Sequence, residues 1–261
     1  QARQTRELLL AAGLHGHRVC VSVGDLAQLP FPPYLFNVVI DQMSLSGTAS
    51  ATPLAEAVRV ARPLGGIVYA GSTGNAARNT DSVQRALAAA CDEGTAVTTD
   101  DGLIQIVRGR LPDTADWTHN YGTPANTYCN EDQQVKGPFG VLWYGDPGPR
   151  ERIDRHATPP IPLVVEGTMF TTADDRLMAF DVYNGVRFWD RSIPGVDRSG
   201  LPIATSNMAA CGVVTATSRS EKEPENGTDA DRPDRSQSHF PLHVVVDDRE
   251  CWEIDSRTGT T

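Results

Sequence analysis

Long hydrophobic runs, cysteine motifs and lysine are scarce in this 261-residue sequence. No apolar run approaches the ~20 residues that a bilayer-spanning helix needs, so the sequence predicts no transmembrane segment. The five cysteines are widely spaced and form no C-x-x-C pair, which argues against a cysteine-based metal site and leaves the redox compartment open. Only two lysines are present, as arginine supplies most of the positive charge, and it is the acidic second half without a basic stripe that argues against nucleic acid as a partner.

Negative charge is concentrated in the second part of the chain. Residues 1–110 contain nine basic and nine acidic residues, whereas residues 111–261 carry the whole net charge of −10. Such a break predicts two units of different kind. Residues 112–126 are rich in Pro, Thr, Asp, Asn and Gly, and we place a linker there. The sequence therefore predicts a first domain over residues 1–111 and a second over residues 127–261.

In the first of these domains, short continuous runs of apolar residues alternate with segments whose apolar residues recur at helical spacing. Turn residues such as Gly24-Asp25 and Gly65-Gly66 separate the runs. Continuous apolar strands alternating with helices predict an α/β fold whose parallel sheet is covered on both faces. Cys20 falls in such a run, and we expect its thiol to be buried. In chain order, we expect a helix over residues 1–14, strands at Val19–Val23 and Phe36–Ile40, a helix at Leu54–Ala61, and strands at Ile67–Ala70 and Leu103–Arg108.

Several of these residues belong to a longer pattern. The motif GD-x-x-x-LPF begins at Gly24, a strand ends at the acidic residue Asp41, and E-x-x-RV-x-RP-x-GG begins at Glu56. Together they resemble the later half of a class I S-adenosylmethionine-dependent methyltransferase, over roughly residues 6–108. The resemblance implies a partial Rossmann-like sheet and methyl transfer to an unknown small-molecule or protein acceptor.

The resemblance also implies a site for S-adenosylmethionine beyond the carboxyl ends of the strands, where open α/β sheets bind ligands. Gly24, Asp25 and Leu26 lie on the adenine side, where the Asp25 carboxylate would accept a hydrogen bond from the adenine amino group. Asp41 and Gln42 would border the methyl donor and the acceptor. Read from the residues alone, Asp25 is equally a turn-forming aspartate after glycine.

Two departures from the family pattern count against activity. Asn37 stands where the family has an acidic residue, and Leu64 is an extra residue between RP and GG. The glycine-rich loop of the family and its ribose-binding acidic residue would lie upstream of Gln1, so we expect the chain to begin inside a domain and to hold an incomplete cofactor site. No catalytic residue is assigned.

In the second part of the chain, the spacing of apolar residues changes to the alternation that is typical of β-strands. Residues 162–170 predict two short strands around Glu166-Gly167, and Arg176–Trp189 predicts a hairpin with Asn184-Gly185 as its turn. The segment Ser218–Ser238 contains ten charged residues and almost no apolar ones, so we interpret it as a disordered insertion.

The strands of this part share an internal sequence repeat. Phe180-Asp181-x-x-Asn184-Gly185 recurs as Ile254-Asp255-x-x-Thr258-Gly259, and Val141-Leu142-Trp143 resembles Arg187-Phe188-Trp189. The pattern resembles the repeat of pyrroloquinoline-quinone-type β-propellers, which implies an all-β, partial propeller of about two blades. We expect the repeated Asp, Gly and Trp to be structural. Pyrroloquinoline quinone and calcium would bind only in a complete propeller.

Three functions therefore stay open. The first is a methyltransferase fused to a propeller. The second is a non-catalytic scaffold whose propeller face binds protein, with the cell envelope or periplasm favoured by the propeller and the cytoplasm as the alternative. The third is quinone-dependent alcohol oxidation. No metal site is predicted, because Pro241 lies between His239 and His243 and prevents a shared helical face.

Overall fold

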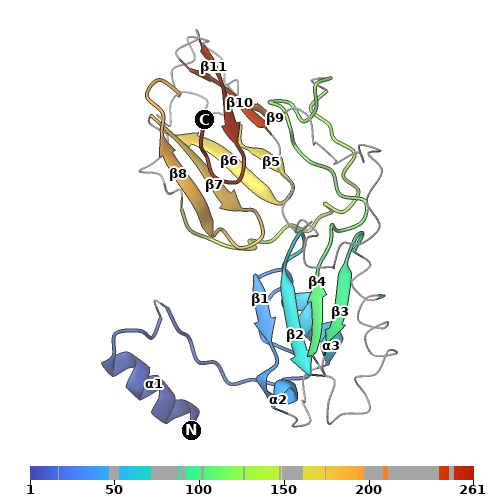
Figure 1. The fold of residues 1–261 in the computed structure, drawn as a ribbon, viewed down its shortest axis with the longest axis vertical. Helices are drawn as coiled ribbons and strands as arrows, with labels where there is room; N and C mark the ends of the chain where they lie inside the picture. Colours follow the sequence, from blue (N-terminus) through green and yellow to red (C-terminus); the bar gives the residue numbers. More distant parts are fainter. Residues whose placement is uncertain are drawn as a thin grey trace, which may run out of the picture.

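The computed structural model describes residues 1–16, 18–46, 53–71, 88, 92–100, 103–125, 127–146, 148, 161–173, 175–196, 208–210, 241–246 and 250–261. Its elements form an α/β unit, in the lower part of Figure 1, and an antiparallel unit above it. The helix α1 (Ala2–Ala11) precedes both and buries none of its residues. No helix in these ranges is long and apolar enough to cross a membrane.

The α/β unit is built on a four-stranded sheet with the order β1-β2-β4-β3. β1 pairs in parallel with β2, whereas β4 is antiparallel to both β2 and β3. Three strands therefore share one direction, and β4 runs against them. In chain order the elements are β1 (Val38–Ile40), α2 (Gln42–Leu45), α3 (Leu54–Val60), β2 (Ile67–Gly71), β3 (Ala96–Asp100) and β4 (Leu103–Val107).

Helix α3 covers one face of this sheet. Its spacing of apolar residues, predicted from the sequence, turns one stripe toward the strands, and the residues of that stripe are almost wholly buried. The helix ends before Arg62-Pro63, because proline cannot continue it. The cluster contains Leu54, Ala57, Val58 and Ala61 from the helix region, and Val68, Ala70, Ile104 and Ile106 from β2 and β4.

One predicted strand of this unit is wrong. Val19–Val23 joins no sheet and makes only an isolated bridge between His15 and Val19. Val19 and Val23 are 40% and 71% exposed, and the Cys20 thiol is exposed rather than buried. A β-branched run becomes a strand only where a neighbouring backbone offers partners, and none of the described residues does so here. The structure adds β3, which the sequence did not predict, since its five residues are all exposed and carry no apolar period.

The antiparallel unit contains two sheets. The first is the four-stranded meander β5-β6-β7-β8, and the second has the order β11-β10-β9. The predicted strands around Glu166-Gly167 and the predicted hairpin with its Asn184-Gly185 turn are confirmed. The strands are β5 (Leu163–Val165), β6 (Thr168–Ala173), β7 (Arg176–Asp181), β8 (Arg187–Ser192), β9 (Met208–Ala210), β10 (Pro241–Val246) and β11 (Glu250–Asp255).

The two sheets pack face to face around one apolar core. From the first sheet, Phe170, Leu177 and Ala179 enter this core, and Leu242 and Ile254 enter it from the second. The alternate residues of β7, Met178 and Phe180, are also fully buried, on the opposite face of the sheet. Strand β7 is therefore apolar on both faces, unlike the edge strand β8. The predicted insertion Ser218–Ser238 lies outside the described residues.

The segment predicted as a linker makes specific contacts. Trp117 exchanges two backbone hydrogen bonds with Val164, of 2.7 and 3.0 Å, and so extends the edge of the first antiparallel sheet. Arg110 donates to Asp116 and, at 2.5 Å, to Glu166 in the β5–β6 turn. Burial lowers the pKa of Arg110, but the two carboxylates outweigh it and raise that pKa overall. The domain boundaries themselves stay predictions.

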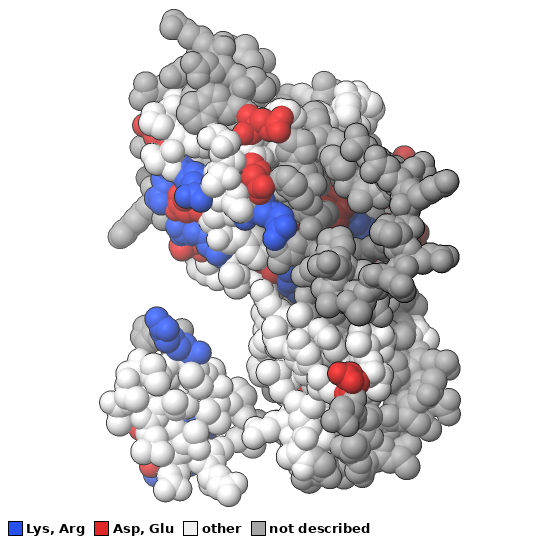
Figure 2. Space-filling view, in the orientation of Figure 1, with Lys and Arg blue, Asp and Glu red and all other residues white. Residues whose placement is uncertain are grey.

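Charge is distributed unevenly over the surface. On the face in Figure 2, basic and acidic side chains gather over the antiparallel unit, whereas the α/β sheet below it is almost free of them.

Candidate functional site

The carboxyl ends of β1 and β2 form a polar edge. Asp41 follows β1, lies half-buried and caps α2, where its Oδ1 accepts a hydrogen bond from Ser44 N at 3.3 Å. Its backbone N–H donates to Tyr69 O at 2.9 Å, which fixes it beside β2. Gln42, the first residue of α2, is exposed next to it. The edge therefore presents one fixed carboxylate and one exposed amide.

Ser44 closes the space between the two strand ends. It is 1% exposed; its Oγ donates to Asp41 O at 3.0 Å and accepts from Gly71 N at 2.8 Å. Gly71 is required there, because a Cβ would collide with the Ser44 carbonyl. A ligand at this edge would lie on the outside of Asp41 and Gln42 rather than between the strands.

The other predicted cofactor residues lie elsewhere, in an exposed turn. Gly24, Asp25 and Leu26 are all exposed, and Asp25 Oδ1 accepts a hydrogen bond from Ala27 N at 2.8 Å. This bond is the one expected of a turn-forming aspartate. The structure thus brings Asp41 and Gln42 to the carboxyl edge of the sheet and places the Gly24–Leu26 group in a turn outside it.

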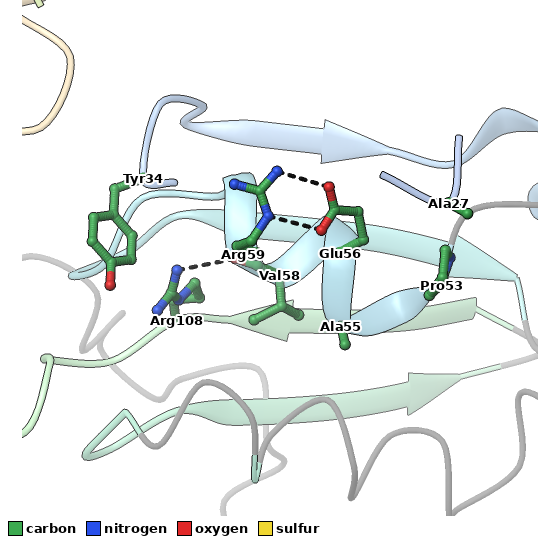
Figure 3. A pocket seen from close by; sticks show the side chains of 8 residues that line it. All are labelled: Ala27, Tyr34, Pro53, Ala55, Glu56, Val58, Arg59 and Arg108. Carbon is green, nitrogen blue, oxygen red and sulfur yellow. Dashed lines mark hydrogen bonds and ion pairs between the residues drawn. The ribbon is translucent and has the colours of Figure 1, made fainter. Parts of the chain in front are cut away.

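A pocket of ≈ 400 Å³ opens beside α3 (Figure 3). An ion pair between Glu56 and Arg59, 2.7 Å apart, crosses its wall. Glu56 also accepts from Leu29 N at 2.6 Å, and Arg59 donates to the carbonyls of Leu29 and Phe31. The pair therefore holds the loop before β1 against the helix. The lining residues are Ala27, Tyr34, Pro53, Ala55, Glu56, Val58, Arg59 and Arg108.

Arg108, at the other end of the pocket, is also fully engaged. It is 3% exposed, donates to the carbonyls of Val58 and Ala61 at 3.0 and 2.7 Å, and forms a bidentate pair with Asp92. The guanidinium thus satisfies the carbonyls at the end of α3. Both arginines of the pocket therefore stabilise the fold. No sequence motif indicated this role for Arg108 or Asp92.

The repeated tryptophans make the same contact twice. Trp143 Nε1 donates to Val182 O at 2.8 Å, and Trp189 Nε1 donates to Ser256 O at 3.0 Å. Each carbonyl belongs to the residue directly after a repeated aspartate. In both cases the ring lies against a glycine with positive φ, Gly185 or Gly259, where a Cβ would collide with the indole. The structural role predicted for the repeat is confirmed.

The turn of the first repeat also contacts the α/β unit. Asn184 Nδ2 donates to Leu35 O at 3.1 Å and to the side-chain oxygen of Asn37. Arg62 Nε lies 3.2 Å from Asp181 Oδ2, and Tyr183 meets Tyr34 edge to face. These contacts involve the amino ends of β1 and β2, opposite the edge that carries Asp41.

The extra residue of the RP-x-GG motif takes part in the same contact. Leu64 adopts φ +55, and its side chain lies against Gly167, where a Cβ would approach Leu64 Cδ1 to 3.1 Å. Asn37 and Leu64, the two departures from the family pattern, are therefore both docking residues. We call the contact of Arg62, Asn37 and Leu64 with residues 167 and 181–184 the inter-unit joint.

Burial dominates the electrostatics of this joint. Desolvation raises the pKa of Asp181, although Arg62 and the turn amides act in the opposite direction. Desolvation likewise raises the pKa of Tyr183 to about 12. Asp181 is fully buried and Arg62 is 13% exposed, so the pair is shielded from solvent. Its geometry is that of an ion pair rather than a hydrogen bond.

Histidines and other potential ligands form no cluster in the described part of the chain. His119 Nδ1 lies 2.8 Å from Thr118 Oγ1. No group of three His, Cys, Asp or Glu side chains in the described ranges is placed to hold a metal ion. His156 and His239 lie outside those ranges.

No family model matches the sequence, and searches of curated proteins and of solved structures find no similar protein.

Proposed function

We propose that the α/β unit is of the S-adenosylmethionine-dependent methyltransferase type and that the antiparallel repeat unit is a platform attached to it. The observation that carries the proposal is the position of Asp41 and Gln42 at the carboxyl end of β1, beside the parallel strand β2. Ligands of open α/β sheets bind at that edge. This position of the predicted acceptor-side residues supports the proposal.

The inter-unit joint removes an objection to the same proposal. Asn37 and Leu64 depart from the family pattern, and on sequence alone they count against activity. Both lie at the amino ends of the strands and contact the Asp181–Gly185 turn or Gly167. Their departures are explained by docking, at the edge where no ligand is expected. They therefore carry no argument against a site at the opposite edge.

The residues of the carboxyl edge fit the polar parts of the cofactor. Bound S-adenosylmethionine would supply an activated methyl group on a cationic sulfur. The Asp41 carboxylate would lie beside that charge, and its cap on α2 keeps the carboxylate in place. Gln42 would orient the acceptor. Asp25 could accept from the adenine amino group through its second carboxylate oxygen, since Ala27 N donates to Oδ1.

Calorimetric titration of the full-length protein with S-adenosylmethionine tests the proposal. We expect measurable heat of binding, and we expect Asp41→Asn to weaken binding by about tenfold, since a hydrogen bond or contact to a charged group contributes ~1.5 kcal/mol or more. Asparagine caps helices as well as aspartate does, so α2 is retained. Asp146→Asn, in the other unit, is the matched control and should bind like the wild type. Absence of binding heat would overturn the proposal.

A non-catalytic binding scaffold is the second candidate, and the Gly24–Leu26 turn favours it. These residues are exposed, and Asp25 makes the bond of an ordinary turn-forming aspartate, as in a protein that needs no adenine site. The face of the repeat unit would then bind protein, in the cell envelope or the cytoplasm. This candidate predicts that S-adenosylmethionine gives no heat while the fold is intact by circular dichroism. Quinone-dependent oxidation stays a weaker proposal, tested by quinone absorbance after reconstitution with calcium.

A further inference from the structure

The side chains of Tyr121 and Tyr128 lie ring against ring. Their ring centroids are 4.0 Å apart, and the ring planes are tilted by 34°. Aromatic pairs in proteins usually have centroids about 4.5–7 Å apart, so this pair is unusually close. The phenol groups interact as well, because a hydrogen bond with Tyr121 raises the pKa of Tyr128. The hydroxyl-bearing ends of the two rings are therefore side by side.

The backbone holds the two rings together. Tyr128 N donates to Tyr121 O at 3.1 Å, and Gly122 N donates to His119 O at 3.0 Å. Gly122 has φ +98, and a Cβ there would approach Cys129 O to 2.9 Å. Glycine therefore allows residues 128–129 to lie this close to residues 121–122. The contact between the rings is fixed by hydrogen bonds of the main chain and by one close backbone approach.

Burial does not account for this pair. Tyr128 is 65% exposed, so its contact with Tyr121 removes little apolar surface from water. Tyr128 also has φ +59, a left-handed conformation that residues other than glycine adopt rarely and at a cost. Backbone strain of this kind is concentrated at functional sites. The exposure of the ring gives a dissolved oxidant access to it.

We propose that Tyr121 and Tyr128 form an oxidative modification site, at which hydrogen peroxide and a haem peroxidase join the two rings as dityrosine. This site goes beyond the proposed function and does not depend on it. Each phenol loses one electron and one proton, and the two phenoxyl radicals couple through a Cε atom of each ring. The hydrogen on each coupled carbon then moves to the phenolic oxygen, which restores both phenols. The protein loses two hydrogen atoms in all, and peroxide takes them up to form two molecules of water.

The geometry of the pair favours this coupling. The Cε atoms flank the hydroxyl, so rings whose hydroxyl-bearing ends are side by side also bring their Cε atoms together. Two reactants held in this way react far faster than the same groups free in solution. The new bond closes residues 121–128 into a covalent loop, which restricts the unfolded chain as a disulfide does.

The other tyrosines provide a comparison within the same molecule. The rings of Tyr34 and Tyr183 are 6.0 Å apart and meet edge to face at 69°, so their hydroxyl-bearing ends are not stacked. Tyr144 is 96% exposed, but no aromatic ring of the described residues is paired with it. Exposure alone therefore predicts coupling of Tyr144 between molecules, whereas stacking predicts coupling of Tyr121 and Tyr128 within one molecule.

Oxidation of dilute protein with a peroxidase and hydrogen peroxide, followed by mass spectrometry, tests the site. Cys129 is replaced by serine throughout, because its exposed thiol would return electrons to the radicals. Trypsin cleaves after Arg110 and Lys136, and the resulting peptide contains Tyr121 and Tyr128 but none of the other tyrosines. We expect this peptide to lose two hydrogen atoms and to show dityrosine fluorescence, while the protein stays monomeric.

Two pairs of variants separate the site from general tyrosine oxidation. Tyr128→Phe keeps the ring but lacks the phenol and should abolish the product, whereas Tyr144→Phe should leave its yield unchanged. Gly122→Ala keeps both tyrosines but displaces the backbone beside Cys129, so the yield should fall several-fold. Gly140→Ala, with nothing within 4 Å of its Cβ position, is the matched control and should react like the parent protein.

Three results would overturn the proposal. The first is a peptide 111–136 that stays unmodified while the oxidant is active on free tyrosine. The second is a product that joins only different molecules. The third is a yield that Tyr128→Phe or Gly122→Ala leaves unchanged.

Discussion

Arg62 Nε lies 3.2 Å from Asp181 Oδ2 and joins the turn after helix α3 to the first repeat of the antiparallel unit. Each residue belongs to a different sequence motif, RP-x-GG in one case and D-x-x-N-G in the other. The ion pair shows that the two motifs meet in space. It also assigns the joint to the amino edge of the α/β sheet, opposite the carboxyl edge that carries Asp41.

The Arg62–Asp181 pair should contribute strongly to stability at neutral pH. Arg62→Ala leaves a buried carboxylate without its cation, and we expect a loss of about 3 kcal/mol in the free energy of unfolding by urea denaturation. Arg3→Ala, at a side chain that is 93% exposed, should change it by less than ~0.5 kcal/mol. Equal effects of the two substitutions would show that the pair does not stabilise the joint.

The same variant should have a distinctive pH dependence. Burial raises the pKa of Asp181, so the folded state holds this proton more tightly than the unfolded state does. This group therefore favours folding at pH values below its ordinary pKa and loses that contribution as pH rises through its raised pKa. Removing Arg62 raises the pKa further, so the deficit of Arg62→Ala should shrink as pH falls. A deficit independent of pH would contradict this assignment.

The side chain of Asn184 should stabilise the inter-unit joint rather than its own turn. The second repeat has Thr258 at this position, so Asn184→Thr keeps a residue that the turn accepts but removes the donor to Leu35 O and Asn37. We expect a loss of about 1–2 kcal/mol in urea denaturation. The reciprocal change, Thr258→Asn, is the matched control and should be nearly neutral. A similar loss in both would assign the effect to the turn alone.

The glycine that lies against the repeated tryptophan should not be replaceable by a residue with a side chain. Gly185→Ala introduces a Cβ that collides with Trp143, at a left-handed φ of +72. Gly94 has a similar φ of +75 with nothing within 4 Å of its Cβ position, so Gly94→Ala measures backbone strain alone. We expect Gly185→Ala to cost at least ~1 kcal/mol more than Gly94→Ala, because the collision adds to the strain. Thermal and urea unfolding of the two variants measure the difference.

The Glu56–Arg59 pair should contribute only above acidic pH. The hydrogen bond from Arg59 lowers the pKa of Glu56, so its stabilisation is complete above the ordinary glutamate pKa, about 4.3, and is lost as pH falls through the lowered value. The wild type and Glu56→Gln should therefore differ in stability at neutral pH and converge in acid. A difference that persists in acid would show that the charge is not responsible.

Much of the fold could be predicted from periodicity and turn chemistry. The helix at Leu54–Val60 follows from its apolar spacing and from Pro63 after it, and the β7–β8 hairpin follows from Asn184-Gly185 between alternating strands. The repeat predicted that Trp143 and Trp189 would share one role, and their hydrogen bonds do so. These signals are local or repeated, which is why the sequence carries them.

The rest depends on contacts between distant residues. Val19–Val23 has the composition of a strand but no described neighbour to pair with, and β3 is a strand because β4 pairs with it. For the candidate site, the sequence correctly associated Asp41 with the end of β1. It could not indicate that Asn37 meets Asn184, which is 147 residues away. The meaning of that departure became clear only from the tertiary structure.

A double-mutant cycle between Arg62→Ala and Asp181→Asn tests the joint most directly. Asparagine keeps an oxygen for the bond to Tyr183 N and removes the negative charge beside Arg62, so the cycle measures the coupling of the pair. If the amino edge of the α/β sheet is docked on the repeat turn, the two losses in unfolding free energy should be coupled by at least ~1 kcal/mol. Losses that add to within ~0.5 kcal/mol would contradict the account, because they would show that the two units do not meet through these residues.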